Sequence, residues 1–233
     1  MTEPIGLTGS AWLGAAPLFG PVDMTLAAGG WSCLLGPSGA GKSTILRLLA
    51  GLPTGARFDG AVRAPARVAL MAQDDLLLPW ADVTDNALIG ARLRGARPDR
   101  ARAAAVIAGV GLAEHAAARP GQLSGGQRQR AALARTLMED AELVLLDEPF
   151  SALDARTRAE MQELTATALA GRTVLLVTHD PAEAARMGDL ILVLEGGRLV
   201  PHPPPPGKVP RPVGDGAVLA MQAALLARLR GAA

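Results

Sequence analysis

Gly36-Pro-Ser-Gly-Ala-Gly41-Lys42-Ser43-Thr44 is the stretch that decides the fold of this 233-residue chain. The apolar run before it, 31–35, predicts a short buried strand, and residues 43–49 after it have helical spacing. A glycine-rich loop between a strand and a helix lets backbone N–H groups surround a phosphate, and the helix dipole strengthens that attraction. Lys42 would reach the outer phosphates of a nucleotide, and the Ser43 hydroxyl would bind magnesium. An ordinary glycine-rich turn is the alternative, and the strand, the spacing, the lysine and the serine together argue against it.

A second candidate site lies at the end of the apolar run 143–146, which predicts a buried strand followed by Asp147 and Glu148. Ligands of parallel sheets bind at the carboxyl ends of the strands, so Asp147 is expected near the magnesium ion. Glu148 is then the best candidate to orient or deprotonate the attacking water. Two neighbouring carboxylates could instead form a solvated turn, an interpretation that weakens beside a phosphate loop.

The stretch Leu123-Ser124-Gly125-Gly126-Gln127-Arg128-Gln129-Arg130 lies about a dozen residues before that strand. A clear helical pattern over 127–138 follows the glycines, so the stretch predicts a second helix N-terminus that is ready for an anion. One chain therefore has two phosphate receptors. We interpret them as halves of a shared site, in which the Lys42 loop of one copy faces the Ser124 helix of another.

The remaining pattern indicates one compact α/β unit. Apolar runs alternate with amphipathic segments, as in a largely parallel sheet covered by helices, and further strands are expected at 68–72 and 174–177. Residues 190–200 predict a terminal hairpin around Gly196 and Gly197.

Two regions depart from this pattern. Residues 73–122 are alanine- and arginine-rich, with Pro98 expected at a first helical position and Gly95 and Gly111 as breaks. We interpret this region as a helical insertion. The tail beyond the hairpin is proline-rich, which predicts a stiff extended linker, and an apolar helix is expected over about 217–229.

Composition excludes several classes of protein. The chain has 23 Lys and Arg against 22 Asp and Glu, which gives no electrostatic footprint for nucleic acid or for an anionic membrane surface. The single cysteine, Cys33, lies in an apolar run and is expected to be a core thiol in a reducing setting. The longest charge-free stretches, 4–22 and 24–41, are broken by Gly, Pro and Ser, so no membrane span is expected. The N-terminus lacks the basic start of a signal peptide, so a role at a membrane would need another subunit.

Over residues from about 5 to 200 the chain resembles the ATP-binding cassette (ABC) family. The resemblance rests on the phosphate loop, the Ser124 signature, the Asp147-Glu148 strand, Ser151-Ala-Leu-Asp154 and His179. It implies an α/β fold of the P-loop NTPase type, with a RecA-like core, an N-terminal antiparallel β subdomain and a helical insertion over about 74–122. The ATPase domain would then occupy 1–200, and 201–233 would form the proline-rich linker and C-terminal helix.

The resemblance also implies roles for individual residues. Glu148, His179 and Gln73 would be catalytic, with His179 as the switch histidine at the γ-phosphate and Gln73 as the Q-loop glutamine that relays the nucleotide state to the insertion. The magnesium ligands would be Ser43, Gln73 and Asp147. The residues that bind ATP would be Trp12, Gly36, Pro37, Ser38, Gly39, Ala40, Gly41, Lys42, Ser43 and Thr44. The signature and the D-loop of a second copy would add Ser124, Gly125, Gly126, Gln127 and Asp154.

Adenine recognition departs from the family pattern. The family stacks the base on an aromatic residue upstream of the phosphate loop, usually tyrosine, and this chain has no tyrosine. Trp12 stands at about the right distance in the sequence, and an indole can stack on a purine. Phe19 is a weaker alternative, and a core role for Trp12 is the other interpretation. His115 and His202 have no motif around them and are expected at the surface.

The run Leu76-Leu77-Leu78-Pro79-Trp80 closely follows Gln73. It is either core of the insertion or a docking surface for a helix of a membrane subunit. It resembles the single-cassette subunits of binding-protein-dependent importers, in the branch that serves nitrate, taurine, alkanesulfonates and thiamine-precursor pyrimidines. The departures from that branch are a short 52–68 segment and the proline-rich tail.

The resemblance therefore implies an ATPase that uses ATP and Mg²⁺ and drives the import of a small solute through a permease. Its partners would be a second cassette, as a homodimer or a pair, the integral membrane permease subunits and, indirectly, a substrate-binding protein, but no nucleic acid. It would act at the cytoplasmic face of the inner membrane as a peripheral subunit. The alternative is a non-transport ABC-type ATPase in signalling or complex assembly, while the Ser124 signature and His179 argue against a P-loop kinase.

Overall fold

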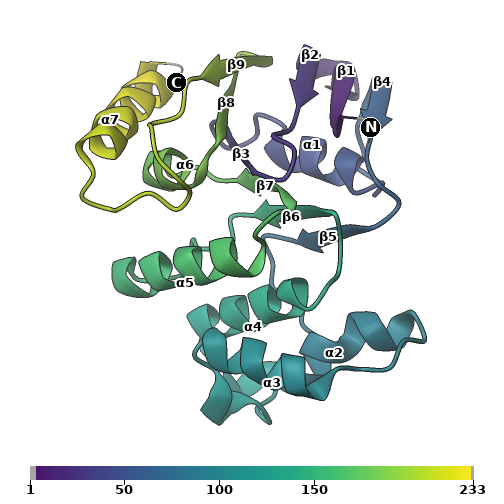
Figure 1. The fold of residues 1–233 in the computed structure, drawn as a ribbon. Helices are drawn as coiled ribbons and strands as arrows, with labels where there is room; N and C mark the ends of the chain where they lie inside the picture. Colours follow the sequence, from purple (N-terminus) through teal and green to yellow (C-terminus); the bar gives the residue numbers. More distant parts are fainter. Residues whose placement is uncertain (1–3, 232–233) are drawn as a thin grey trace. The chain divides into compact units, whose positions relative to one another are not determined.

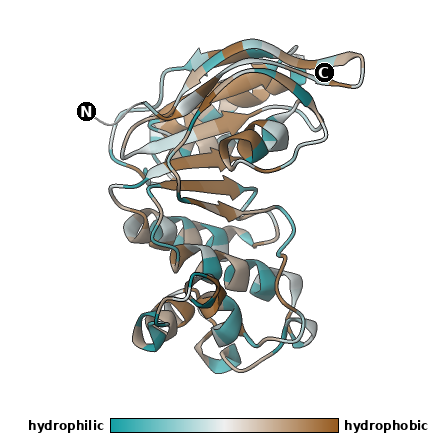
Figure 2. Cartoon of the chain, turned by 90° about the vertical axis from the view of Figure 1, so that its right-hand side faces the viewer, coloured by the Kyte–Doolittle hydropathy of each residue, from teal (hydrophilic) through white to brown (hydrophobic). Residues whose placement is uncertain are grey.

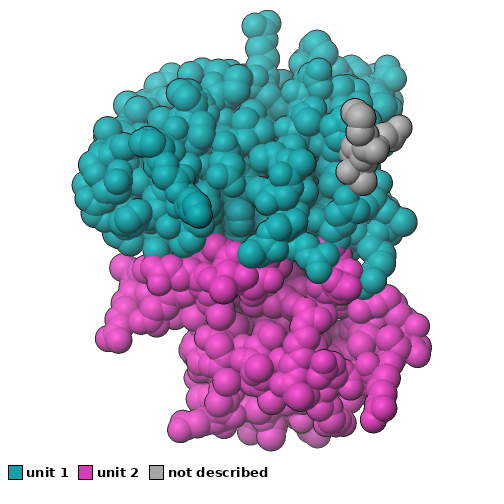
Figure 3. All heavy atoms as spheres, viewed as in Figure 1, with its two compact units in different colours: residues 1–68, 142–148, 170–233 teal, residues 69–141, 149–169 magenta. Residues whose placement is uncertain are grey.

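The computed structural model describes residues 4–231, which divide into two compact units. Unit 1 comprises residues up to 68, 142–148 and those from 170 onwards, and unit 2 comprises 69–141 and 149–169 (Figure 3). The expectation of one compact unit was therefore wrong. The physical reason is that unit 2 buries its own apolar side chains, including Leu88, Ile107, Leu112 and Leu133.

Unit 1 contains a small antiparallel sheet near the N-terminus. It is formed by β1 (Gly6–Leu13), β2 (Ala16–Thr25) and β4 (Arg57–Arg63), in the order β2-β1-β4. Strand β1 pairs antiparallel with both neighbours. Its inward side chains include Leu7 and Ala11, both fully buried. The expected antiparallel β subdomain is confirmed.

The main sheet of unit 1 contains the strands that precede the phosphate loop, the Asp147-Glu148 pair and His179. Its order is β6 (Leu143–Asp147), β7 (Thr173–Val177), β3 (Trp31–Leu35), β8 (Leu190–Glu195) and β9 (Arg198–His202). The first four strands are parallel, and β9 closes the expected hairpin antiparallel to β8. Every residue of β3, β6 and β7 is buried, which is why these strands are apolar except for Ser32, Asp147 and Thr173 (Figure 2).

The described part of unit 1 contains three helices: α1 (Lys42–Leu49), α6 (Pro181–Met187) and α7 (Gly216–Gly231). Helix α1 packs against β6 and β7, and α6 packs between β3 and α7 (Figure 1). The apolar helix expected in the tail is α7, which inserts Val218 and Leu225 into the unit while most of its surface stays exposed. Between residues 4 and 231, the structure has no helix with the length and apolar character that a membrane crossing needs.

Unit 2 is mainly helical. The chain enters it within β5 (Val68–Met71) and continues through α2 (Val83–Leu93), α3 (Arg100–Gly109), α4 (Gly125–Leu137) and α5 (Ala155–Ala168), with two 3₁₀ turns at Ala113–His115 and Pro120–Gln122. Helices α2 and α3 pack on each other and on α4. Asp82, Asp99, Ser124 and Asp154 cap the N-termini of the four α-helices by accepting hydrogen bonds from backbone N–H groups of the first turn.

The helical breaks were predicted correctly, but the start of α3 was not. Gly95 and Gly111 follow the ends of α2 and α3 with φ of 67° and 69°, in the left-handed region that favours glycine. Pro98 does not occupy a first helical position, because the Asp99 carboxylate accepts the Arg102 N–H at 2.9 Å and so makes Asp99 the cap of α3. Pro98 lies one residue before that cap.

Candidate nucleotide site

The phosphate loop joins β3 to α1 and requires glycine at both of its ends. Gly41 has φ of 101°, and a Cβ there would lie 2.9 Å from the Phe19 ring. A Cβ on Gly36 would lie 2.5 Å from the backbone oxygen of Leu194. Both contacts are closer than real Cβ atoms allow, so the loop can follow this path only with glycine at these places.

Lys42 lies inside the loop and is 7% exposed. Its ammonium donates to the carbonyl oxygens of Gly36 at 2.8 Å and Pro37 at 2.9 Å. Burial lowers the pKa of Lys42, while the charges of Glu148 and Asp147 oppose this effect. An ammonium has three N–H donors, so the geometry leaves one for a further oxygen, such as that of a phosphate.

Asp147 and Ser43 form an oxygen pair at the end of β6. Burial raises the pKa of the Asp147 carboxyl, and the hydrogen bond with the Ser43 side chain opposes that rise. Glu148 raises the same pKa further, whereas Lys42 and Arg47 lower it. A hydroxyl and a carboxylate in direct contact are hard oxygen donors of the kind that Mg²⁺ prefers, and the buried negative charge gains from a cation, so the residues fit a magnesium ion.

The desolvated carboxylate of Asp147 gives a testable prediction on stability. Because burial raises the pKa of Asp147, the folded chain disfavours the charged form. Asp147→Asn should therefore raise the Tm without nucleotide by a few degrees, the scale on which single substitutions shift the Tm of a chain of this length. The gain should be present at neutral pH and vanish near the ordinary carboxyl pKa of about 3.9, below which wild-type Asp147 is protonated in both states. Calorimetry of the two proteins across pH checks this, and an unchanged or lowered Tm at neutral pH would contradict it.

Glu148 has an unusual backbone conformation, with φ of 50° in a residue other than glycine. Its N–H donates to the Val177 oxygen at 2.9 Å, which continues the pairing of β6 with β7 by one residue. His179 follows the end of β7, and its Nδ1 lies 3.1 Å from Oε1 of Glu148. The Glu148 side chain is 17% exposed and that of His179 is 60% exposed. A left-handed residue at a strand end is a strained feature of the kind found at functional sites, and here it accompanies the contact between the two candidate catalytic groups.

The signature forms a capped helix start in unit 2. Ser124 Oγ accepts the Gln127 N–H at 3.3 Å, and Gln127 Oε1 accepts the Ser124 N–H at 2.7 Å. Gly125 and Gly126 therefore occupy the first turn of α4, which begins two residues earlier than the predicted 127. Gln73 is exposed two residues after β5.

The segment Ser151 to Asp154, the D-loop that the resemblance implies, is held by a residue whose role was not predicted from the sequence. Gln129, 7% exposed on α4, donates to Ser151 Oγ at 3.2 Å and accepts the Ala152 N–H at 3.0 Å. Asp154, three residues after Ser151, accepts the Thr157 hydroxyl at 2.8 Å at the start of α5. Gln129 stands inside the quoted signature stretch, but only its burial marks it as a support for the D-loop.

The two aromatic residues considered for adenine stacking, Phe19 and Trp12, differ in their exposure to solvent. Phe19 is 2% exposed and belongs to the core. Trp12 is partly exposed, and the Arg57 guanidinium carbon lies 4.4 Å from its ring centroid, a cation–π contact with no signal in the sequence. His115 and His202 are partly buried instead of fully at the surface, and His115 contacts the Gln127 amide at 3.0 Å.

Unit 1 thus carries the phosphate loop, Asp147, Glu148, His179 and Trp12, while Gln73, the signature and Asp154 belong to unit 2. A phosphate loop with a strand-end carboxylate pair defines a P-loop nucleotide hydrolase. Residues 19–151, more than half of the chain, match the family described as ABC transporter. The chain belongs to the ABC transporter family, and within it the chain is an ATP-binding subunit that hydrolyses ATP.

Curated relatives extend the match beyond that region. The chain is 50% identical over 180 residues to the aliphatic sulfonates import ATP-binding protein SsuB 2 of Streptomyces avermitilis, covering 76% of this chain and 71% of the relative. It is 43% identical over 235 residues to SsuB 2 of Pseudomonas aeruginosa, with coverage of 97% and 84%, and 42% identical over 223 residues to an uncharacterized ABC transporter ATP-binding protein of Haemophilus influenzae, with coverage of 92% and 93%. Among solved structures, a chain described as part of an inward-facing ABC transporter of the metal-chelate type matches with a TM-score of 0.73 and 27% identity, covering 86% of this chain and 83% of that one.

Proposed function

We propose that the chain energises the import of a small organic anion of the sulfonate type through a membrane permease, at the cytoplasmic face of the inner membrane. The support for this cargo is the name that relatives at 43–50% identity carry, which is aliphatic sulfonates import ATP-binding protein. The observation that supports the coupling is the exposure of Leu76 (63%) and Trp80 (71%) directly after Gln73. Residues 1–200 would form the ATPase domain, and 201–233 would form the tail.

The residues of unit 1 have separate tasks in the proposed hydrolysis. Lys42 donates to the β- and γ-phosphates, and Gly36 to Thr44 surround them with backbone N–H groups. Ser43 and Asp147, together with Gln73 of unit 2, would hold the magnesium ion, which would draw negative charge from the phosphate oxygens. Trp12 stacks on the adenine with the ring face that Arg57 does not cover.

The water-activating group is Glu148. Its carboxylate orients the attacking water and accepts a proton from it, since no other carboxylate follows Asp147 at this strand end. His179 lies within hydrogen-bond distance of that carboxylate, so the imidazole fixes the side chain of Glu148. The proposed second task of His179 is contact with the γ-phosphate. The left-handed backbone at residue 148 sets the direction of the carboxylate.

The proposed assembly contains two cassettes. Ser124, Gly125, Gly126 and Gln127 of a second copy approach the γ-phosphate with the N-terminus of α4, and Asp154 lies at the dimer seam. The support is that one chain carries two helix starts suited to phosphate, α1 and α4. The permease binds the insertion, and a substrate-binding protein delivers the cargo to the permease.

Growth of a deletion strain tests the proposed cargo. Loss of the chain should prevent growth on alkanesulfonates as the sole sulfur source and leave growth on sulfate normal. The wild-type gene should restore growth, whereas the Lys42→Ala variant should not, because it lacks the charge held against the phosphates. Taurine, pyrimidine precursors and nitrate are tested in parallel. Normal growth on every compound would contradict the cargo while leaving the ATPase assignment intact.

A further inference from the structure

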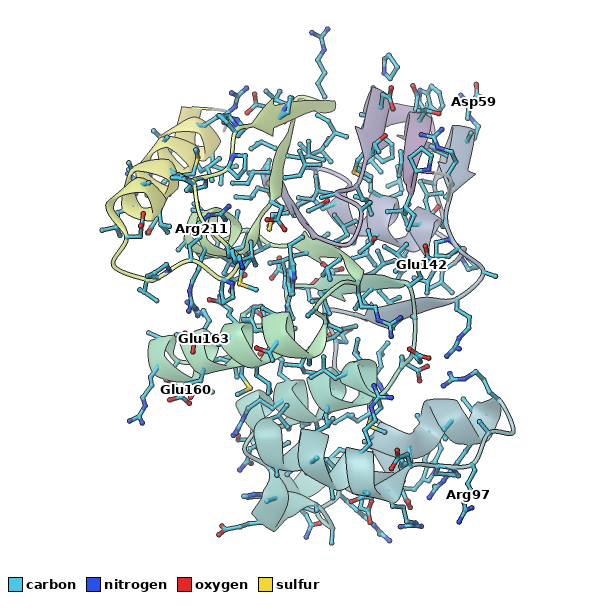
Figure 4. All side chains as sticks on the ribbon, viewed as in Figure 1. Asp59, Arg97, Glu142, Glu160, Glu163 and Arg211 are labelled. Atoms are coloured by element: carbon cyan, nitrogen blue, oxygen red, sulfur yellow. The ribbon has the colours of Figure 1, made fainter. Side chains whose placement is uncertain are left out.

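A buried cation, Arg211, helps to anchor the segment beyond β9 in unit 1. This side chain is 2% exposed, although it belongs to a proline-rich loop, and Figure 4 labels it beside α6. Its Nη1 donates to the carbonyl oxygens of Ala185 at 3.2 Å and Gly188 at 2.9 Å, and its Nε donates to Pro206 at 3.2 Å. A cation at these last carbonyls suits the negative end of a helix dipole.

The attachment between the loop and α6 is reciprocal. The Arg211 N–H donates to the Arg186 oxygen at 3.0 Å, and the Arg186 side chain returns a hydrogen bond from Nε to the Arg211 oxygen at 2.8 Å. Arg186 is itself 5% exposed. Two buried arginines from segments 25 residues apart therefore fix the C-terminal end of α6. Removing one of them would leave buried carbonyl groups without their donors.

His179 lies at the opposite, N-terminal end of the same helix, one residue before its cap Asp180. Helix α6 has only seven residues, so its two ends are roughly 10 Å apart and move as one body. Thr178 donates to the Glu183 carboxylate of α6 at 2.7 Å, and Asp180 caps α6 by accepting the Ala182 N–H at 2.8 Å. His179 stands between these two residues, so its position depends on α6 from both sides.

We propose that Arg211 is a positioning residue for ATP hydrolysis, which holds α6 in place and thereby keeps His179 beside Glu148. This inference rests on the proposed role of His179. It gives the proline-rich tail a task in the motor, because the tail supplies the buried cation that ends α6. Lysine could keep the charge, but it lacks the planar fork that reaches separate carbonyl oxygens at once.

Steady-state phosphate release by the purified full-length subunit tests the inference. Arg211→Met should lower kcat by roughly tenfold or more, in line with the cost of a misplaced catalytic group, and leave the KM for ATP unchanged because the phosphate loop is intact. Arg211→Lys should recover part of the loss. The matched control is Arg228→Gln, which releases the ion pair of α7 with Glu195 and leaves every hydrogen bond between Arg211 and α6 in place. It should keep normal turnover.

The same variants are then combined with His179→Ala. If Arg211 acts through His179, Arg211→Met should cause no further loss in the His179→Ala background. Equal losses in both backgrounds, a raised KM or normal turnover of Arg211→Met would each overturn the inference. Normal turnover of His179→Ala alone would refute the proposed role of His179, and the inference with it. Thermal melting shows whether Arg211→Met folds. If it does not, Arg211→Lys takes its place: it should lower kcat without changing the KM, by a smaller factor, and it should do so only where His179 is intact.

Discussion

Replacement of Glu148 by glutamine should lower the rate of phosphate release by about 100-fold or more, the contribution expected of a general base. Glutamine has nearly the shape of glutamate and can still hydrogen-bond to His179, but its amide accepts no proton at neutral pH. ATP binding should stay near normal, because Lys42 and the phosphate loop are unchanged. Single-turnover phosphate release and equilibrium binding of a fluorescent ATP analogue measure the two quantities separately.

Two comparisons sharpen that test. Glu142→Gln changes an exposed carboxylate immediately before the same strand, labelled in Figure 4, and should keep full turnover. Lys42→Ala should instead fail at binding.

The Glu148→Gln variant with saturating MgATP should also sediment as a dimer, since ATP would remain between the Lys42 loop and the opposite Ser124 helix. Near-normal turnover would remove Glu148 from its role, and sedimentation as a monomer would contradict the shared site.

The strands of unit 1 could be predicted from the sequence because they obey a simple physical rule. Central strands of a parallel sheet are covered on both faces, so the stretches 143–146 and 174–177 contain only apolar residues, and both are fully buried. The phosphate loop could be predicted because its geometry dictates residue types. At Gly36 and Gly41 a Cβ atom would lie too close to neighbouring atoms, so glycine must appear at these positions in the sequence. The separate core of unit 2 could not, since its alanine-rich helices lack a strong apolar periodicity.

The supports of the site were harder to predict than its chemical groups. Gln129, Arg211 and Asn86 are polar residues to which the sequence assigned no role, and each acts through long-range or backbone hydrogen bonds. A polar residue in a sequence is normally expected at the surface, and only its burial reveals that it has partners. The resemblance implied catalytic roles for Glu148 and His179, but neither the contact between their side chains nor the left-handed backbone at Glu148 was predicted from the sequence.

The run Leu76 to Trp80, called here the docking run, shows what the sequence could and could not predict. Sequence alone left Leu76 to Trp80 as either core or surface, and the structure divides them: Leu77 is 8% exposed, whereas Leu76 and Trp80 are 63% and 71% exposed. Asn86 on α2 is fully buried, and its amide hydrogen-bonds to the backbone of Leu78 and Ala81. Arg135 adds bonds to the carbonyl oxygens of Leu76 at 2.7 Å and Asp75 at 2.8 Å. The loop is therefore held rigidly with two large apolar side chains in solvent.

Changing Trp80 to glutamate should lower substrate uptake by the assembled transporter by tenfold or more, since a tryptophan at the centre of an interface contributes about 2 kcal/mol or more. The ATPase rate of the isolated subunit should stay near normal, because Trp80 is not part of the nucleotide site. Its Tm should also change little, as expected for a surface position. Leu93→Glu is the matched control: this side chain is 80% exposed at the end of α2, outside the docking run, and the variant should transport normally. Normal uptake by Trp80→Glu would refute the docking assignment, and equal losses in both variants would show that any added charge on the insertion is harmful. A selective loss, with co-purification of the permease reduced to the same extent, would identify the run after Gln73 as the surface through which hydrolysis reaches the membrane subunit.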